Sequence, residues 1–375
     1  MKVLHICNDF SGSKVHANLY KSLESLGVSQ VVYTYFINPK YIGRNFFQSE
    51  YTKIIYANVL TKYDRYFFYY KGWKLFCDLR KHINPDDIDI CHATTLFSDG
   101  SVAYRLYKKY HIPYIVTIRN TDINLHLRNA SYRWPYAKRI LLNAAMIIFI
   151  SEASKNKFCN HSYIQKFLLC LKDKMIVIPN GIDDYWLNCP ALNRQIPANN
   201  HKVVYVGVFD ENKNIFRLAE AVMSLRKKYP DIHLTLVGGR GALKEQVKEM
   251  ACHNPDVIDY CGLITDKEVL RNIYLQHSIF AMPSFHETLG LVYIEAISQG
   301  LACIYTKGQG IDGMFPSETG IGVNPGSVSE IANAIDFIFQ NRLEYSNSSI
   351  DLDAFRWSRI SQIYYNMYMS ILGDC

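Results

Sequence analysis

Residues 282–300 read MPSFHETLGLVYIEAISQG, and they follow the apolar run Ile279–Ala281. That run is typical of a short buried strand, and the stretch Gly290–Gln299 is typical of a helix. Gly300 suits the position just after a helix, where the backbone often needs a positive φ angle. A strand, a polar loop and a helix form the repeating unit of a parallel α/β sheet.

The same alternation extends over the rest of the chain. In the first half, the runs typical of buried strands are Val3–Cys7, Gln30–Thr34, Ile88–His92, Tyr114–Ile118 and Met146–Ile150. The pattern restarts in the second half with Val203–Val208, Leu234–Val237, Val257–Tyr260, Ile279–Ala281 and Ala302–Tyr305. Helical patterns such as Ser13–Leu26 and Phe216–Lys227 lie between these runs. The alternation predicts an α/β protein with two Rossmann-like αβα domains.

The boundary between these domains is predicted near residues 178–183, IPNGID, where a strand ends in turn residues. We expect a first domain over residues 1–183 and a second over residues 184–355. An aromatic-rich helix over residues 356–375 follows. The length of 375 residues suits two domains.

The lack of a signal-peptide or membrane-spanning pattern, together with the spacing of the cysteines, leads us to expect a cytoplasmic protein. No run of 18 apolar residues is present, and the segment Met1–Cys7 lacks the pattern of a signal peptide. The ten cysteines show neither CxxC nor zinc-finger spacing, so we expect reduced thiols.

Charge is distributed unevenly between the two halves. Residues 1–183 contain 25 basic and 13 acidic side chains, a net charge of +12, and residues 184–375 contain 16 and 21, a net charge of −5. No nucleic-acid-binding signature accompanies the basic half. We therefore expect no nucleic-acid partner, and favour a phosphorylated acceptor or an anionic membrane surface. A solvated basic surface without a partner is the alternative.

The segment 63–74, YDRYFFYYKGWK, mixes aromatic and basic residues. Such a segment suits a membrane interface, and it equally suits an amphipathic helix packed on the sheet.

The start of the helix at Gly290 is a candidate anion site. The free backbone N–H groups of Leu289, Gly290 and Leu291, beside Thr288, lie at the positive end of the helix dipole. This arrangement suits a diphosphate.

Glu287 and Glu295 flank this candidate anion site. Because carboxylates repel a diphosphate, their presence needs another reason. They accept hydrogen bonds from paired hydroxyls, so we expect Glu295 to bind a ribose and Glu287 a transferred sugar. Taken singly, Glu287 is equally explained as a helix-capping acid and Glu295 as a solvated helix residue.

The pattern Pro-Ser-x-x-Glu-x-x-Gly-Leu-x-x-x-Glu-Ala in this segment resembles the donor motif of glycosyltransferase family 4. The resemblance continues in residues 178–183, 205–207, 213–214, 236–239 and 262–264. It implies the GT-B fold, with two domains facing across a cleft and the helix over 356–375 crossing back to the first domain.

The resemblance also implies a function. Members of the family are retaining enzymes that use a nucleoside-diphosphate sugar. The implied acceptor is a glycan or a polyprenyl-linked glycan in polysaccharide or glycolipid assembly, such as that of lipopolysaccharide or capsule. We expect a cytoplasmic protein. The charge of residues 1–183 and the segment 63–74 suit peripheral contact with the inner face of the cytoplasmic membrane, and a solvated basic surface with a helix packed on the sheet remains the alternative.

Several further donor residues are implied by the resemblance. Gly207 and Gly262 end two strands of the second domain, and Lys213 matches a lysine that binds the diphosphate. Val208 stands where relatives carry an arginine, which weakens the expected charge clamp. Without the resemblance, a lysine such as Lys213 at a strand–loop junction is explained as a solvated side chain.

The acceptor side is matched by fewer residues. Gly12 and Ser13 lie in a small-residue loop, which a plain strand-to-helix turn explains equally well. Arg119 stands where many relatives carry a histidine, and it suits either a phosphate contact or a structural pair with Asp122. His92 ends a strand, as a cleft residue or as a hydrogen-bonded structural histidine.

Neither a metal nor another cofactor is expected. No Asp-x-Asp occupies a setting suited to a metal–diphosphate complex, and Asp351 and Asp353 lie in the terminal region as a surface or capping pair. The alternative functions are a catalytically inactive nucleotide-sugar-binding protein and a non-hydrolysing sugar-nucleotide epimerase. A dinucleotide oxidoreductase is disfavoured, because residues 238–241 do not give GxGxxG.

Overall fold

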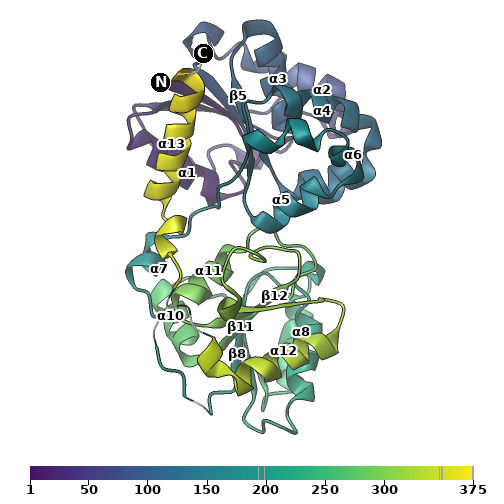
Figure 1. Cartoon of the computed structure of the whole chain (residues 1–375), viewed down its shortest axis with the longest axis vertical. Helices are drawn as coiled ribbons and strands as arrows, with labels where there is room; N and C mark the ends of the chain where they lie inside the picture. The colour runs from purple at the N-terminus through teal and green to yellow at the C-terminus, as the bar shows by residue number, and fades with distance from the viewer. Residues whose placement is uncertain (193, 198, 346, 348, 374–375) are drawn as a thin grey trace. The chain divides into compact units, whose positions relative to one another are not determined.

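The computed structural model describes residues 1–192, 194–197, 199–345, 347 and 349–373, and it divides into two compact units (Figure 1). The first unit comprises Met1–Ile150, Ser154–Gly181 and Ala354–Cys375, and the second comprises Ser151–Ala153 and Ile182–Asp353. The main division therefore falls between residues 181 and 182, where the sequence suggested 183 and 184.

A seven-stranded parallel sheet forms the centre of the first unit, in the order β3-β2-β1-β4-β5-β6-β7. Its strands are β1 (Lys2–Ile6), β2 (Ser29–Tyr35), β3 (Thr52–Ala57), β4 (Ile90–Ala93), β5 (Tyr114–Ile118), β6 (Met146–Phe149) and β7 (Met175–Val177). Its main helices are α1 (Lys14–Glu24), α2 (Phe68–Leu79), α3 (Ser98–Tyr110), α4 (Trp134–Asn143), α5 (Glu152–Cys159), α6 (Ser162–Gln165) and α13 (Trp357–Gly373).

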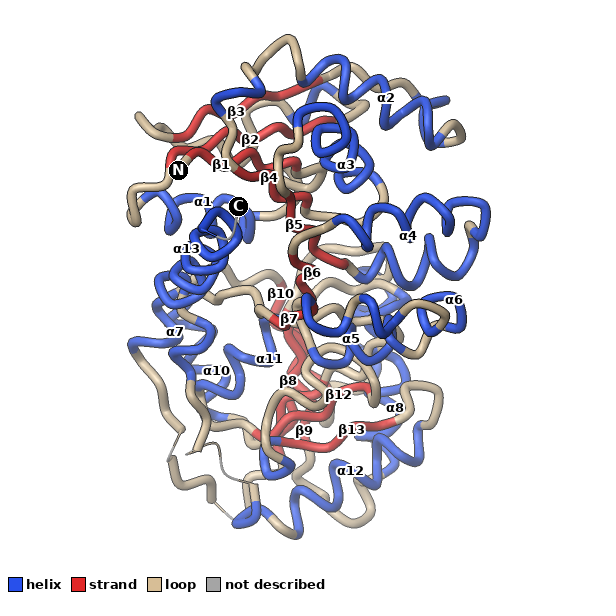
Figure 2. Tube along the Cα trace, turned by 45° about the horizontal axis from the view of Figure 1, so that its top comes forward, coloured by secondary structure: helices blue, strands red, loops and turns tan. Residues whose placement is uncertain are grey.

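Both faces of this sheet are buried, as its continuous apolar strands predict. In β1, Leu4 and Ile6 contribute to one core, whereas Val3 contributes to the other, because successive side chains point to opposite faces. Helices α1 and α13 cover one face, and α2, α3 and α4 lie on the other (Figures 1 and 2).

The C-terminal helix α13 is part of the first core and lies beside α1. Its Tyr364 and Tyr368 are buried against β4. The ring of Tyr364 stacks on His92 at 5.4 Å, and the Tyr368 hydroxyl lies 3.2 Å from Nδ1 of His92. The helix expected over residues 356–375 therefore belongs to the hydrophobic core of the first unit.

The second unit holds a six-stranded parallel sheet in the order β10-β9-β8-β11-β12-β13. Its strands are β8 (Lys202–Val206), β9 (His233–Val237), β10 (Ile258–Gly262), β11 (Ile279–Ala281), β12 (Ala302–Thr306) and β13 (Gly320–Val323). Its main helices are α7 (Asp184–Asn188), α8 (Ile215–Ser224), α9 (Lys244–His253), α10 (Lys267–Gln276), α11 (Leu291–Ser298) and α12 (Val328–Gln340).

The prediction of two parallel α/β sheets is confirmed, and the strand predictions failed at two sheet edges. Strands β3 and β13 were not predicted, and each lies at the edge of its sheet. Edge strands are buried less continuously, and β13 contains two glycines, so neither gives a strong apolar run.

We expect Tyr368→Ala to lower the free energy of unfolding by about 3–5 kcal/mol, because it removes a fully buried aromatic ring and a partner of His92. Met369→Ala is the matched control, since Met369 is exposed on the same helix. Urea unfolding of both variants measures the difference. Equal, small losses in the two variants would show that α13 contributes little to the first core.

Candidate active site

Three glycines mark the carboxyl edge of the second sheet, where open parallel sheets bind ligands. A Cβ atom on Gly207 would lie 2.8 Å from the Tyr205 hydroxyl, and one on Gly238 would lie 2.2 Å from the carbonyl oxygen of Gly207. Gly262 has a φ of +70° and accepts a hydrogen bond from the N–H of Gly238 at 2.9 Å. The loops after β8, β9 and β10 thus approach closely because side chains are absent there.

The loop after β8 is tied to the loop after β11 by asparagine side chains. The side-chain amide of Asn212 donates to the carbonyl oxygen of His286 and accepts from its N–H, both at 2.9 Å. Asn214 is buried, has a φ of 59°, and donates to the carbonyl oxygen of Pro283 at 3.1 Å. Asparagine tolerates this left-handed backbone better than most residues. The two loops therefore form one structural element.

This tie brings Lys213 and Glu287 together. The Lys213 ammonium lies 2.6 Å from Oε2 of Glu287, and their side chains are 19% and 14% exposed. The N–H of Lys213 donates to Oδ1 of Asp210 at 3.0 Å, which fixes the turn that carries it. A lysine ammonium has three donors, so two remain after the bond to Glu287.

Gly290 sets the start of helix α11. It has a φ of +74°, and a Cβ atom there would lie 2.5 Å from the ring of Tyr293. The helix begins at Leu291, one residue later than expected, and Gly290 is its N-cap. Gly300 has a φ of +77° and follows the C-cap residue, as predicted.

The backbone N–H groups of residues 289–292 find no acceptor among the described residues. Four consecutive free donors at a helix start are suited to an anion. The N–H of Thr288 differs, because it donates to Oε1 of Glu287 at 3.1 Å. The structure thus provides the predicted donors at Leu289, Gly290 and Leu291, adds Val292, and shows the Thr288 N–H already occupied.

Two residues that hold Glu287 were not identified from the sequence. The side-chain oxygen of Gln309 accepts from the N–H of Glu287 at 3.4 Å, and the N–H of Gly310 donates to its carbonyl oxygen at 3.2 Å. Gly310 has a φ of 55°. The neighbouring glycines Gly308 and Gly310 were the one sequence signal that could have indicated this turn.

Glu295 has surroundings different from those of Glu287. Burial raises the pKa of Glu295 to about 8, with a further rise from Asp183 and a smaller lowering by Lys267. Asp183 and Lys267 pair with each other at 2.5 Å. Glu295 is therefore largely protonated at neutral pH, and a protonated carboxyl group both donates and accepts hydrogen bonds.

On the first sheet, Gly12 and Ser13 form the turn that starts α1. The Ser13 hydroxyl caps α1 by accepting from the N–H of Val15 at 3.3 Å, and a Cβ atom on Gly12 would lie 2.1 Å from Oδ1 of Asp9. These contacts account for both residues by local structure.

Arg119 contacts Asp122 through its backbone and Thr94 through its side chain. Its N–H, not its guanidinium, donates to Oδ2 of Asp122 at 3.0 Å, and its Nε donates to the carbonyl oxygen of Thr94 at 3.3 Å. Asp122 also accepts from the N–H groups of Leu96 and Phe97. The side-chain pair with Asp122, one of the two alternatives, is therefore not formed, and the partly exposed Arg119 follows β5 at the carboxyl edge of β4 and β5.

His92 is a core residue. It is 2% exposed, its Nε2 lies 2.9 Å from the Thr117 hydroxyl, and burial lowers its pKa well below the ordinary value. Both ring nitrogens have protein partners. These contacts are those of a hydrogen-bonded structural histidine, which was the alternative given for His92, and its place on the acceptor side stays a prediction.

Within the described ranges, no three His, Cys, Asp or Glu side chains are grouped so that they could hold a metal ion. Asp351 accepts from the N–H of Asp353 at 3.1 Å, which is a capping contact. Nor does any described helix have the length and apolar character needed to cross a membrane.

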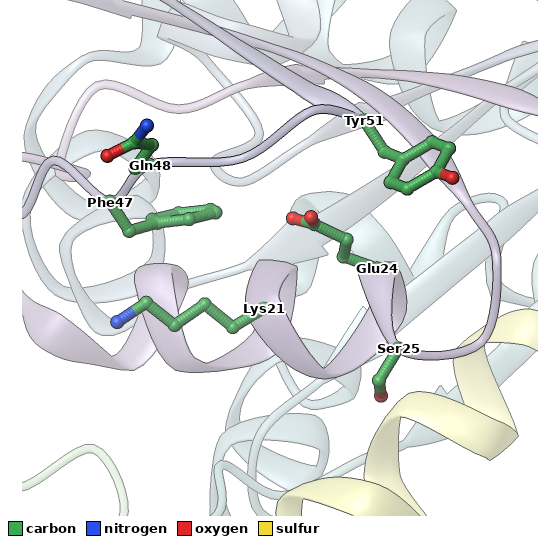
Figure 3. Close-up of a pocket in the computed structure, with 6 residues that line it drawn as sticks. All are labelled: Lys21, Glu24, Ser25, Phe47, Gln48 and Tyr51. Atoms are coloured by element: carbon green, nitrogen blue, oxygen red, sulfur yellow. The ribbon is translucent and has the colours of Figure 1, made fainter.

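A separate cavity of about 600 Å³ lies in the first unit (Figure 3). It is lined by Lys21, Glu24, Ser25, Phe47, Gln48 and Tyr51. These residues come from the end of α1 and from the segment preceding β3, at the amino edge of the sheet. Because ligands of such sheets bind at the opposite edge, we assign this cavity no part in the candidate active site.

Comparison with known families gives two matches. The model described as Glycosyltransferase Family 4 matches residues 12–185, and the model described as Glycosyl transferases group 1 matches residues 193–351. A curated relative, the putative teichuronic acid biosynthesis glycosyltransferase TuaC of Bacillus subtilis, is 23% identical over 247 residues. That match covers 66% of this chain, and the chain spans 60% of the length of TuaC.

Solved structures match the whole chain. Sucrose-phosphate synthase from Thermosynechococcus elongatus has a TM-score of 0.74 at 21% identity, and all of both chains is covered. Alr3699/HepE of Anabaena, solved in complex with UDP, has a TM-score of 0.66 at 15% identity, covering 100% of this chain and 99% of that chain. At these identities the likeness establishes the fold, and it confirms the predicted GT-B class.

The raised pKa of Glu295 predicts a pH-dependent cost to stability. Folding favours the neutral form, so wild-type stability relative to Glu295→Gln should fall as pH rises from about 4.5 to about 8. Above pH 8 the glutamine variant should be more stable by roughly 1–3 kcal/mol, a range reduced for the partial exposure of this side chain. Urea unfolding at pH 5, 7 and 9 checks this. A stability difference independent of pH would contradict it.

Proposed function

Because the chain belongs to glycosyltransferase family 4, we propose that it transfers a sugar from a nucleoside-diphosphate sugar to an acceptor with retention of anomeric configuration. The observation that carries the proposal is the Lys213–Glu287 ion pair, with the free N–H groups of residues 289–292 following in the same loop. UDP bound to Alr3699/HepE supports a nucleotide donor.

In the proposed reaction, the bond between the sugar C1 and the diphosphate oxygen breaks as the acceptor hydroxyl oxygen bonds to C1 on the same face. The hydroxyl proton passes to the departing diphosphate. Negative charge grows on the phosphate oxygens, and the Lys213 ammonium and the N–H groups of residues 289–292 would stabilise it most in the transition state. Gly207 and Gly262 would allow the donor to approach the backbone closely.

The two glutamates would bind hydroxyl groups of the donor. Glu295, largely protonated at neutral pH, can donate to one hydroxyl of a ribose diol and accept from the other. Lys213 donates to Oε2 of Glu287 and the N–H of Thr288 donates to Oε1. Each oxygen accepts a single bond there, and its remaining lone pair would accept from a hydroxyl of the transferred sugar.

We place the acceptor among glycans and polyprenyl-linked glycans of surface polysaccharide or glycolipid assembly, such as lipopolysaccharide or capsule. The net charge of +12 on residues 1–183 would attract this part of the protein to the anionic inner face of the cytoplasmic membrane, where such acceptors lie. The partly exposed Arg119 guanidinium is the candidate contact for a phosphate group of such an acceptor.

A catalytically inactive nucleotide-sugar-binding protein is the second candidate, because Val208 stands where relatives carry a cationic side chain. A panel of nucleotide sugars in thermal-shift assays identifies the donor. With that donor, release of nucleoside diphosphate only after an acceptor is added supports a transferase. Binding without release supports the inactive protein, and conversion of the donor without acceptor supports an epimerase.

Lys213→Ala and Glu287→Ala should each fold and lose about 100- to 1000-fold in transfer rate, since each removes one member of the proposed donor-binding pair. Lys228→Ala is the matched control, because it breaks an exposed ion pair with Asp336 in the same unit. Initial rates and circular dichroism of all three variants measure activity and folding. Full turnover by either site variant would refute the assignment.

Chelation should leave transfer unchanged, because Lys213 and backbone N–H groups, not a metal ion, are proposed to neutralise the diphosphate. Initial rates with and without excess EDTA measure this, and added Mg²⁺ tests for stimulation. Activity abolished by EDTA and restored by a divalent cation would contradict the proposal.

A further inference from the structure

Helix α2 exposes aromatic side chains where a solvated helix would carry polar ones. Phe68 and Leu75 pack in the core of the first unit. On the opposite side, Tyr69, Tyr70 and Trp73 are 47%, 51% and 50% exposed. An ordinary amphipathic helix is apolar on one face only, so the outer face of α2 is suited to contact something other than water.

Two neighbouring aromatic residues extend this outer face. Phe67 directly precedes α2 and is 63% exposed, and Tyr132, in the short 3₁₀ helix Ser131–Arg133, is 55% exposed. The Tyr69 hydroxyl donates to the carbonyl oxygen of Tyr132 at 3.4 Å, which places Tyr132 next to α2. We call Phe67, Tyr69, Tyr70, Trp73 and Tyr132 the aromatic surface.

Cationic side chains adjoin the aromatic surface at fixed positions. The Arg133 guanidinium lies 5.1 Å from the centre of the Tyr132 ring, and it donates to Nδ1 of His126 at 3.0 Å. Burial lowers the pKa of His126 to about 4, so this histidine is a neutral acceptor that orients Arg133. Arg105 donates to the carbonyl oxygen of Tyr69 at 3.2 Å.

Arg105 and Arg133 have no acidic partner. In the part of the chain that the structure describes, neither guanidinium has a carboxylate oxygen within 4 Å. Lys71, on α2, differs, because its ammonium is largely buried, donates to the Ser98 hydroxyl at 3.1 Å and is attracted by Asp99. The acids of the same region are engaged internally. Asp64 pairs with Lys74 at 3.0 Å, and Asp99 accepts from the hydroxyls of Tyr35 and Thr94.

We propose that the aromatic surface docks the protein on a lipid bilayer that contains anionic phospholipids. This inference rests on the proposed function, in which a lipid-linked acceptor lies in such a bilayer. Tyrosine and tryptophan favour the membrane interface because their rings are apolar with one polar group. Each unpaired lysine or arginine near an anionic leaflet raises the partition coefficient of the protein onto the membrane by about fivefold.

A second copy of this chain fits the aromatic surface less well. It would bring the unpaired cations Arg105 and Arg133 of one copy against those of the other, and like charges brought together in an interface are unfavourable. An anionic bilayer instead supplies the missing negative charge over an extended area. Charge complementarity therefore favours the lipid surface.

Cosedimentation of the full chain with vesicles tests the proposal. Wild type should bind mixed phosphatidylcholine–phosphatidylglycerol vesicles more tightly than phosphatidylcholine alone. The triple variant Phe67→Ser, Tyr70→Ser and Trp73→Ser should lower the partition at least about tenfold, because three interfacial side chains are lost. A control variant, Ile42→Ser with Phe46→Ser and Leu169→Ser, changes three other exposed apolar residues of the same unit and should bind like wild type.

A second pair of variants tests whether the cations beside the aromatic surface matter more than the overall positive charge of the first unit. Arg105→Gln with Arg133→Gln should reduce the partition by about 25-fold, which is fivefold for each cation. Lys108→Gln with Lys172→Gln removes the same charge from exposed positions outside the aromatic surface and should have a much smaller effect. Equal losses in the two pairs would show that only the overall charge of the first unit matters, and would overturn the proposal.

Tryptophan fluorescence reports contact directly. Among the described residues, Trp73 is exposed, Trp134 and Trp357 are half-buried, and Trp186 is buried. Brominated phospholipids should quench wild-type fluorescence, and Trp73→Phe should abolish the quenching while vesicle binding persists. The proposal is wrong if the wild-type protein does not bind anionic vesicles, or if the serine triple variant binds them as tightly as wild type. It is also wrong if the aromatic surface mediates dimerisation of the chain instead of membrane binding. None of these readouts needs a sugar donor, so they are independent of whether transfer is observed.

Discussion

The candidate active site depends on the hydrogen bonds that tie two loops of the second unit together. Asn212 and Asn214 follow β8, and their side chains bind the backbone of the loop that follows β11. Through this tie, Lys213 and Glu287, separated by 74 positions in sequence, lie 2.6 Å apart. A backbone held at both loops keeps the two charged groups in place before any ligand arrives, and such preorganisation is what electrostatic stabilisation of a transition state needs.

Charge balance explains why acidic groups are tolerated beside donors suited to a diphosphate. Glu287 is already paired with Lys213, so its negative charge is offset. Glu295 is largely neutral at pH 7 because burial raises its pKa to about 8. Neither glutamate therefore presents a full unpaired negative charge, while both keep oxygens that can bind hydroxyl groups.

Sequence patterns predicted the fold well where strands are buried on both faces, as in β1 and β8, and failed at the edge strands β3 and β13. They also located the helix after Gly290, because only glycine suits its positive φ beside the Tyr293 ring. The asparagine tie was not predictable, since it joins loops far apart in sequence. His92 was ambiguous for a related reason: its partners Thr117 and Tyr368 come from β5 and α13, and a sequence does not show which side chains meet across a fold.

The most direct test is a crystal structure of the protein with a nucleoside diphosphate bound. We predict that phosphate oxygens lie within hydrogen-bonding distance of the N–H groups of residues 289–292 and of the Lys213 ammonium, and that the ribose hydroxyls bind Glu295. A diphosphate bound elsewhere, with these N–H groups unoccupied and Glu295 away from the ribose, would contradict it.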